Sequence, residues 1–234
     1  AGHQVLLFDA REGAARDALA KVALIFASLV SKGKLGADEA ERTLARIEPL
    51  SALEDSASAH LVVEAIVENL DAKRALFTQL EAIVGTHCVL ATNTSSISVT
   101  AIANGLKHPG RLVGMHFFNP VPLMKLVEVI RALTTSPQTH QALFAFAQQL
   151  GKEPVSAPDR GGFIVNRLLI PYMLDAIRCH EGGLGTIEDI DTAMKLGANH
   201  PLGPLELADF IGLDTCLAIM QVLYEGLSDS KYRP

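Results

Sequence analysis

Short apolar runs alternate with longer segments of helical periodicity through the first two thirds of the chain. Continuous apolar runs of this kind are typical of parallel strands that are covered on both faces. We expect strands at Val5–Phe8, Leu61–Ile66, Val89–Ala91, Leu112–Phe118, Leu126–Ile130 and Glu153–Ser156. We expect helices at residues 12–32, 37–47, 71–84, 97–104 and 136–150. This alternation predicts an α/β fold with a doubly wound, mostly parallel sheet.

The last third of the chain has a different pattern. Residues 157–162 combine proline, two charged residues and paired glycines, which is the composition of a linker. Beyond it the apolar residues keep a helical period, and we expect helices at Phe163–His180, Ile187–Leu196 and Leu205–Leu227. The sequence therefore predicts two domains. Residues 1–158 form the sheet domain, with a helical hairpin inserted at about 12–47, and residues 159–234 form a smaller, incomplete all-α domain.

Composition narrows the class of protein. Hydrophobic residues make up 49% of the 234 residues, and a mean hydropathy of +0.26 provides enough apolar material for a globular, soluble core. The sequence has no uncharged apolar run of about eighteen residues, so we expect no membrane partner. The formal charge of −6 argues against a nucleic-acid partner. It also means that an anionic substrate would need a local basic patch.

Three cysteines, Cys88, Cys179 and Cys216, are widely spaced and lie in apolar surroundings. An odd number with this spacing suits neither a disulfide framework nor a metal site. We therefore expect reduced thiols, a cytoplasmic location and no bound metal.

A candidate acid–base pair lies on two neighbouring strands. Two prolines, Pro120 and Pro122, separate the strand that ends at Phe118 from the strand that begins at Leu126, and proline disfavours helix there. If the chain folds back between them, residues whose numbers sum to 244 face each other, as His116 and Glu128 do. A carboxylate beside imidazole raises its pKa and fixes its tautomer, which suits a general base. The alternative is a structural histidine and a surface glutamate.

Several ordered motifs carry a family resemblance. The segments His116–Pro122 and Lys125–Ile130 resemble the catalytic segment of the L-3-hydroxyacyl-CoA dehydrogenase family, in particular its 3-hydroxybutyryl-CoA dehydrogenase-like members. The same family order continues in Val63–Asn69, Thr92–Ser96, Gly162–Arg167 and Gly203–Leu207, so the resemblance covers essentially the whole chain. It implies a Rossmann-type NAD-binding domain followed by a helical domain, oxidation of an acyl-CoA substrate to the 3-ketoacyl-CoA, and a homodimer formed through the helical domain.

The resemblance also implies four catalytic residues. His116 would be the general base, paired with Glu128. Ser95 would bond the 3-oxygen of the substrate beside the nicotinamide, and Asn166 would bond the substrate and hold His116 in place. From the residues alone two alternatives remain. The segment Thr92–Ser96 could cap the following helix, and Asn166 could be an ordinary helix-start residue.

For the cofactor, the resemblance implies contacts from Glu68, Lys73, Ser95 and Asn119. Asp9 ends the first apolar run, where an acid bonds the adenosine ribose hydroxyls in dinucleotide-binding folds and repels the 2′-phosphate of NADP. The alternative for Asp9 is a helix cap, and for Glu68 and Lys73 an ordinary carboxylate at a helix start and a solvated lysine.

For the substrate, the resemblance implies that Lys32 contacts the CoA phosphates, with Lys34 close by. The alternative is a solvated lysine at a helix end. Together with Ser95 and Asn166, Lys32 completes the residues expected to bind the acyl-CoA.

The start of the chain differs from the family pattern. The glycine-rich turn that should precede Val5–Phe8 by some twenty residues is absent, so we expect a chain that has lost its first strand and that binds dinucleotide poorly. Relatives also continue past Pro234. A larger parent, in which this module belongs to a multifunctional fatty-acid oxidation protein, therefore stays open. So does a non-catalytic, crystallin-like relative, although joint retention of Ser95, His116, Glu128 and Asn166 argues against decay.

Overall fold

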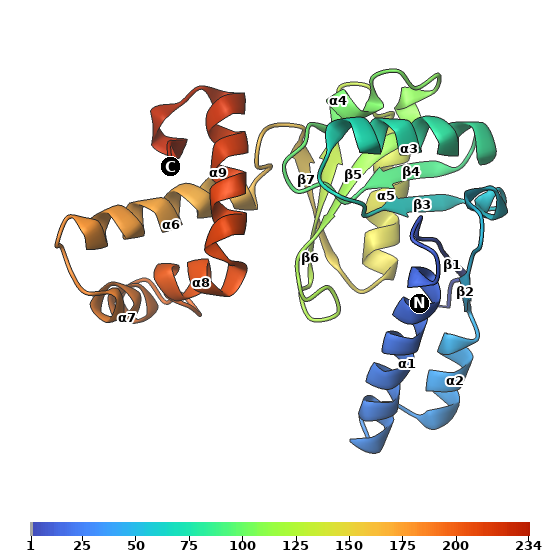
Figure 1. Ribbon diagram of the computed structural model, residues 1–234, viewed down its shortest axis with the longest axis horizontal. Coiled ribbons are helices and arrows are strands. Elements are labelled where there is room, and N and C mark those ends of the chain that lie inside the picture. The colour runs from blue at the N-terminus through green and yellow to red at the C-terminus, as the bar shows by residue number, and fades with distance from the viewer. Residues whose placement is uncertain (1) are drawn as a thin grey trace.

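The computed structural model describes residues 2–234 and has two lobes joined by a single connection after strand β7 (Figure 1). The first lobe is built on a five-stranded sheet, and the second contains only helices. These two parts correspond to the predicted α/β fold with a smaller all-α region. The exact domain boundary stays a prediction.

The main sheet has its strands in chain order. They are β3 (Leu61–Glu64), β4 (Val89–Thr92), β5 (Leu112–Phe117), β6 (Leu126–Arg131) and β7 (Glu153–Pro158). Strands β5 and β6 are antiparallel, and the other neighbouring pairs are parallel. The predicted fold-back at the two prolines is therefore confirmed.

Helices cover both faces of this sheet, as the continuous apolar runs predicted. Helices α3 (Leu70–Ile83) and α4 (Val99–Ala103) pack on one face, and α5 (Pro137–Gln149) packs on the other (Figure 1). Neighbouring residues of one strand point to opposite faces, so Leu90 belongs to the core under α3 and Ala91 to the core under α5. A strand buried on both faces reads as an unbroken apolar run.

A second, smaller sheet lies at the N-terminal end. Strand β1 (Val5–Leu7) pairs in parallel with β2 (Ile47–Pro49), and among the described residues neither strand pairs with the main sheet. Between them, α1 (Ala14–Ser31) and α2 (Ala37–Leu44) form the predicted hairpin, which projects away from the main sheet (Figure 1). The sequence extended the second helix to residue 47 and missed β2. The chain is extended rather than helical here because the residue before Pro49 prefers extended backbone.

The helical lobe contains α6 (Val165–Glu181), α7 (Ile187–Gly197), α8 (Pro204–Ile211) and α9 (Leu213–Leu227). The prediction of one helix at Leu205–Leu227 was wrong. Gly212 has φ 98°, a conformation that leaves the helical region, and the axes of α8 and α9 differ by 96°. The apolar pattern continues across this glycine because both helices bury side chains in one core, which includes Ala208 and Met220.

Three short 3₁₀ helices complete the described elements, at Leu53–Ser56, Pro109–Arg111 and Ser230–Tyr232. No helix of residues 2–234 is long and apolar enough to cross a membrane by itself, although α8 and α9 would pass that test if taken together. All three cysteines are free thiols.

Candidate active site

His116 and Glu128 face each other across strands β5 and β6. They are register partners, and His116 Nδ1 lies 2.8 Å from Glu128 Oε2. Both residues are buried, with 4% of His116 and 1% of Glu128 exposed. Because an ionised carboxylate can only accept a hydrogen bond, the Nδ1 atom carries the ring proton and Nε2 is left as the acceptor. The predicted pairing is confirmed, and the alternative of a surface glutamate is wrong.

The second oxygen of Glu128 connects the two lobes. Glu128 Oε1 accepts hydrogen bonds from the backbone N–H groups of Ile164 and Val165, each at 3.0 Å, where helix α6 begins. Two N–H groups at a helix start stabilise a buried anion, because the positive end of the helix dipole lies there. The same carboxylate therefore orients the imidazole and anchors the helical lobe beside it.

Aromatic rings enclose the imidazole. The ring centroid of Phe118 lies 4.6 Å from that of His116, and the centroid of Phe163, from the connection between the lobes, lies 5.6 Å away. These rings keep water from the pair and strengthen its electrostatic interaction. The histidine is thus held from one side by an acid and from two others by apolar surfaces.

Residues 93–98, between β4 and α4, form a segment that we name the Ser95 loop. The Glu68 carboxylate holds its first half, because Glu68 Oε1 accepts hydrogen bonds from the Thr94 hydroxyl at 2.6 Å and from the N–H groups of Ser95 and Ser96 at 2.9 and 3.0 Å. Burial by itself would raise the pKa of Glu68, but the Thr94 hydroxyl, the Lys73 ammonium and the two N–H groups hold this pKa below its ordinary value. Glu68 is therefore an anion that organises the loop.

Lys73 lies underneath this arrangement. Only 1% of its side chain is exposed, and its Nζ is 2.7 Å from Glu64 Oε1 and 3.3 Å from Glu68 Oε2. Thr92 donates to the other oxygen of Glu64 at 2.7 Å. The alternative of a solvated lysine is wrong. Glu64 had no predicted role, because a single acid in an apolar run carries no signal of its buried partner.

Asn166 reaches the Ser95 loop from the helical lobe. Its Nδ2 donates to the backbone oxygen of Ser95 at 3.3 Å. Asn166 is the second residue of α6, but its side chain does not cap that helix. The expected contact of Asn166 with His116 is also absent from the hydrogen bonds of residues 2–234, and the amide acts on Ser95 instead. Ser98 caps α4, and within Thr92–Ser96 the Thr94 hydroxyl accepts a hydrogen bond from the Ile97 N–H group at 2.9 Å, so this segment also supports the chain before that helix.

A cavity of about 570 Å³ lies between the Ser95 loop and helix α9. The sheet lobe contributes Ala65, Ile66, Glu68, Asn93, Ser95 and Ser96, and α9 contributes Asp214, Thr215, Ala218, Ile219 and Val222. The cavity lies beyond the carboxyl ends of the parallel strands β3 and β4, where open α/β sheets bind nucleotides. Its lining combines polar side chains with apolar ones, as small-molecule sites do. The lining residues of α9 belong to no motif and were not predicted.

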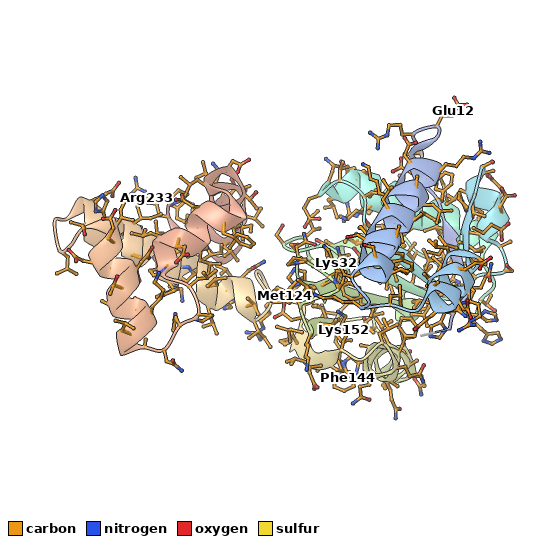
Figure 2. The ribbon with its side chains drawn as sticks, turned by 90° about the horizontal axis from the view of Figure 1, so that it is seen from below. Glu12, Lys32, Met124, Phe144, Lys152 and Arg233 are labelled. Carbon is orange, nitrogen blue, oxygen red and sulfur yellow. The ribbon has the colours of Figure 1, made fainter. Side chains whose placement is uncertain are left out.

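Five expected binding residues do not line this cavity: Lys73 and Asn166, which are described above, and three that lie on the surface. Asp9, Asn119 and Lys32 are exposed and do not line it. Asp9 Oδ1 accepts a hydrogen bond from the N–H group of Arg11 at 2.8 Å, and the cap of α1 is Gly13, so Asp9 does not cap that helix. Lys32 follows the last residue of α1, at the turn of the hairpin (Figure 2). Their ligand contacts stay predictions.

Two family models match the chain. The model "3-hydroxyacyl-CoA dehydrogenase, NAD binding domain" matches residues 1–160, and "3-hydroxyacyl-CoA dehydrogenase, C-terminal domain" matches residues 162–234. Together they cover both lobes.

Individual proteins match over nearly the whole chain. A probable 3-hydroxybutyryl-CoA dehydrogenase of Bacillus subtilis is 48% identical over 234 residues, which are 100% of this chain and 82% of that protein. The mitochondrial hydroxyacyl-coenzyme A dehydrogenase of Homo sapiens is 47% identical over 96% of this chain and 73% of its own length. The crystal structure of (S)-3-hydroxybutyryl-CoA dehydrogenase from Ralstonia eutropha superposes with a TM-score of 0.95 at 45% identity, over 99% of this chain and 82% of that one.

Proposed function

The chain belongs to the 3-hydroxyacyl-CoA dehydrogenase family of NAD-dependent oxidoreductases, and from this premise we propose that it oxidises an L-3-hydroxyacyl-CoA with His116 as general base. The observation that carries the proposal is the buried contact of 2.8 Å between His116 Nδ1 and Glu128 Oε2, beside the Ser95 loop. The fold uses Glu128 to hold the helical lobe, but it does not need an imidazole at position 116. An acid–base reaction needs it.

His116 accepts the proton of the substrate hydroxyl on Nε2, since Nδ1 already donates to Glu128. As the O–H bond breaks, the C3 hydrogen leaves with its electron pair and the C3–O bond becomes a carbonyl. The imidazolium that forms is stabilised by the Glu128 carboxylate, whose other oxygen accepts hydrogen bonds from two backbone N–H groups. General-base catalysis of this kind contributes about 10²- to 10⁴-fold to the rate.

Ser95 and Asn166 hold the reacting oxygen. Ser95 lines the cavity, and none of the hydrogen bonds of residues 2–234 uses its hydroxyl, which leaves that group for the substrate. Asn166 keeps one amide contact with the loop and can offer the rest of its amide to the same oxygen. Two polar groups that position the substrate supply much of the reduction in the activation barrier, because the C3 hydrogen is transferred only when C3 is correctly placed.

NAD supplies the nicotinamide carbon that receives this hydrogen and its electron pair. Glu68, Lys73, Ser95 and Asn119 are proposed around its nicotinamide half, and Asp9 at the adenosine ribose. Glu68 and Ser95 line the cavity directly, whereas Lys73 is buried behind Glu68 and supports it. The charge of Asp9 favours NAD over NADP.

The CoA phosphates are proposed to bind at the hairpin. Lys32 and Lys34 are exposed near its turn and form a local basic site on a chain of net charge −6. This is the patch that an anionic thioester needs.

A homodimer through the helical lobe is proposed as well. Five large apolar side chains of that lobe are more than half exposed: Leu168, Leu184, Leu196, Phe210 and Leu213. Exposed apolar side chains at this density are typical of an interface. Residues 1–158 and 159–234 are the proposed domains, and the three free thiols support a cytoplasmic location.

An assay of the intact protein with acetoacetyl-CoA and NADH tests the proposal in the reverse direction. We expect a loss of NADH absorbance that depends on both reactants. Absence of turnover would favour the non-catalytic, crystallin-like alternative. Hydratase activity in the same polypeptide would favour the multifunctional one.

A further inference from the structure

The second half of the Ser95 loop is held by a residue that no motif singles out, Asp159. Asp159 Oδ2 accepts hydrogen bonds from the Ser98 hydroxyl and the Thr100 N–H group, each at 2.7 Å, and Oδ1 accepts one from the Val99 N–H group at 3.0 Å. These partners precede or begin helix α4 and are about sixty positions away in sequence. Short bonds to an ionised acceptor are stronger than neutral ones.

Asp159, the residue that anchors helix α4, is itself fixed to the main sheet. Asp159 directly follows β7, and its own N–H group donates to the backbone oxygen of Arg131 at the end of β6, at 3.1 Å. None of the ion pairs of residues 2–234 includes Asp159, so backbone N–H groups and one hydroxyl hold its charge. The carboxylate is thus placed by the sheet edge and points at α4.

Helix α4 needs such an anchor. It spans only Val99–Ala103, and a helix this short is not stable by itself because its first N–H groups lack partners within the helix. Helix α4 directly follows the Ser95 loop, so the position of the helix fixes the C-terminal end of the loop. The first half is held separately by Glu68.

Asp159 also begins the connection to the helical lobe, which carries Asn166. Asn166 bonds the backbone of Ser95, and Ile164 and Val165 bond Glu128. One segment of eight residues therefore touches both the Ser95 loop and the acid of the His116 pair. We infer that Asp159 is a positioning residue, which holds the Ser95 hydroxyl in register with His116 by tying helix α4 to the start of this connection. The inference rests on the proposed function of Ser95.

A purely stabilising cap offers a matched control. Asp191, in helix α7, accepts hydrogen bonds from the N–H groups of Leu205 at 2.8 Å and Glu206 at 2.9 Å, in the first turn of α8. Like Asp159, it accepts hydrogen bonds from two N–H groups in the first turn of a helix, but none of the hydrogen bonds of residues 2–234 joins it to the Ser95 loop. If capping alone mattered, Asp159→Asn and Asp191→Asn would have the same consequences.

The test compares both variants in the intact protein. For Asp159→Asn we expect kcat with acetoacetyl-CoA and NADH to fall about ten- to a hundredfold, since small misplacements of reacting groups are that costly. The KM for NADH should stay within about twofold, because the cofactor-facing Glu68 is untouched. Asp191→Asn should lower the melting temperature and leave kcat unchanged.

Hydrogen exchange of the ligand-free protein gives a readout independent of turnover. In Asp159→Asn an NH₂ group replaces one of the two acceptor oxygens, so at least one of the amides of Val99 and Thr100 loses its acceptor and exchanges faster. If Asp159 positions the loop, the amides of Ser95 and Ser96 also exchange faster, although Glu68 is intact. Faster exchange confined to Val99 and Thr100, wild-type kcat, or an equal loss of kcat in Asp191→Asn would overturn the inference. Absence of turnover in the wild type would overturn the proposed function instead, and the exchange measurement would still decide the coupling.

Discussion

The acid–base pair and the hairpin that is proposed to bind CoA are built in opposite ways. His116 and Glu128 are buried on central strands, and every polar atom of Glu128 has a partner within the protein. Lys32 is exposed at the end of a helix that buries only Ala14 and Ala15. The fold therefore assembles the proposed reacting groups without a ligand, whereas the proposed phosphate contacts would form only on binding. Loss of a buried group should stop the chemistry, and loss of an exposed one should weaken binding.

The largest effect is expected for His116→Gln. The amide fills the space and can still donate to Glu128, so the fold survives, but it cannot accept a proton at neutral pH. We expect kcat to fall about 10²- to 10⁴-fold with little change in melting temperature. Steady-state kinetics and calorimetry measure both. A kcat within a few-fold of the wild type would show that His116 is not the base.

Glu128→Gln should affect turnover and stability together. The amide either turns its NH₂ group toward the N–H groups of Ile164 and Val165, which is repulsive, or donates it to His116 Nδ1, which moves the ring proton to Nε2 and removes the base. We expect about a hundredfold loss in kcat and a loss of about 1–3 kcal/mol in the free energy of unfolding.

Glu81→Gln is the control for that variant. Glu81 also accepts hydrogen bonds from two N–H groups, those of Lys107 and His108 at 2.7 and 2.9 Å, but it lies outside the proposed site. We expect lower stability and unchanged kcat. Equal kinetic losses in the two variants would mean that Glu128 acts only by stabilising the fold.

Lys32→Ala tests the exposed region. We expect the KM for acyl-CoA to rise about two- to fivefold, the range of an exposed charge contact, with kcat unchanged. The difference from the wild type should shrink at high salt, because exposed charges are screened. Lys21→Ala, on the same helix, is the control and should have no effect. A change of kcat alone would contradict the contrast between the two regions.

The smallest effect concerns the pH dependence of stability. The pKa of Glu68 is lower in the folded protein than its ordinary value of 4.5, so its contribution is fully present above that value and is lost as the pH falls through the folded pKa. Melting temperatures between roughly pH 3 and pH 6 should therefore fall more steeply in the wild type than in Glu68→Gln. Parallel curves would indicate that Glu68 is not held as an anion.

The local sequence pattern predicted the pairing of His116 with Glu128. The two prolines define the turn, and the alternation of side chains along the strands then defines the register. The local pattern did not predict β2, whose three residues carry too little periodicity, nor the bend at Gly212, where apolar residues continue on both sides. It also treated Lys73 as exposed by default. Its burial depends on Glu64, nine positions earlier, which comes beside it only when strand β3 and helix α3 pack together.

Sequence alone determined the strands of the main sheet, most helices, the family and the candidate reacting residues, since these depend on neighbours within a few positions and on short ordered motifs. Only the tertiary structure decided which of these groups contact one another. The N–H groups of Ile164 and Val165 reach Glu128 across 36 and 37 positions, and those of Val99 and Thr100 reach Asp159 across 60 and 59. A hydrogen bond requires two atoms within about 3 Å. Over such separations that distance is a property of the packed fold and of no local pattern.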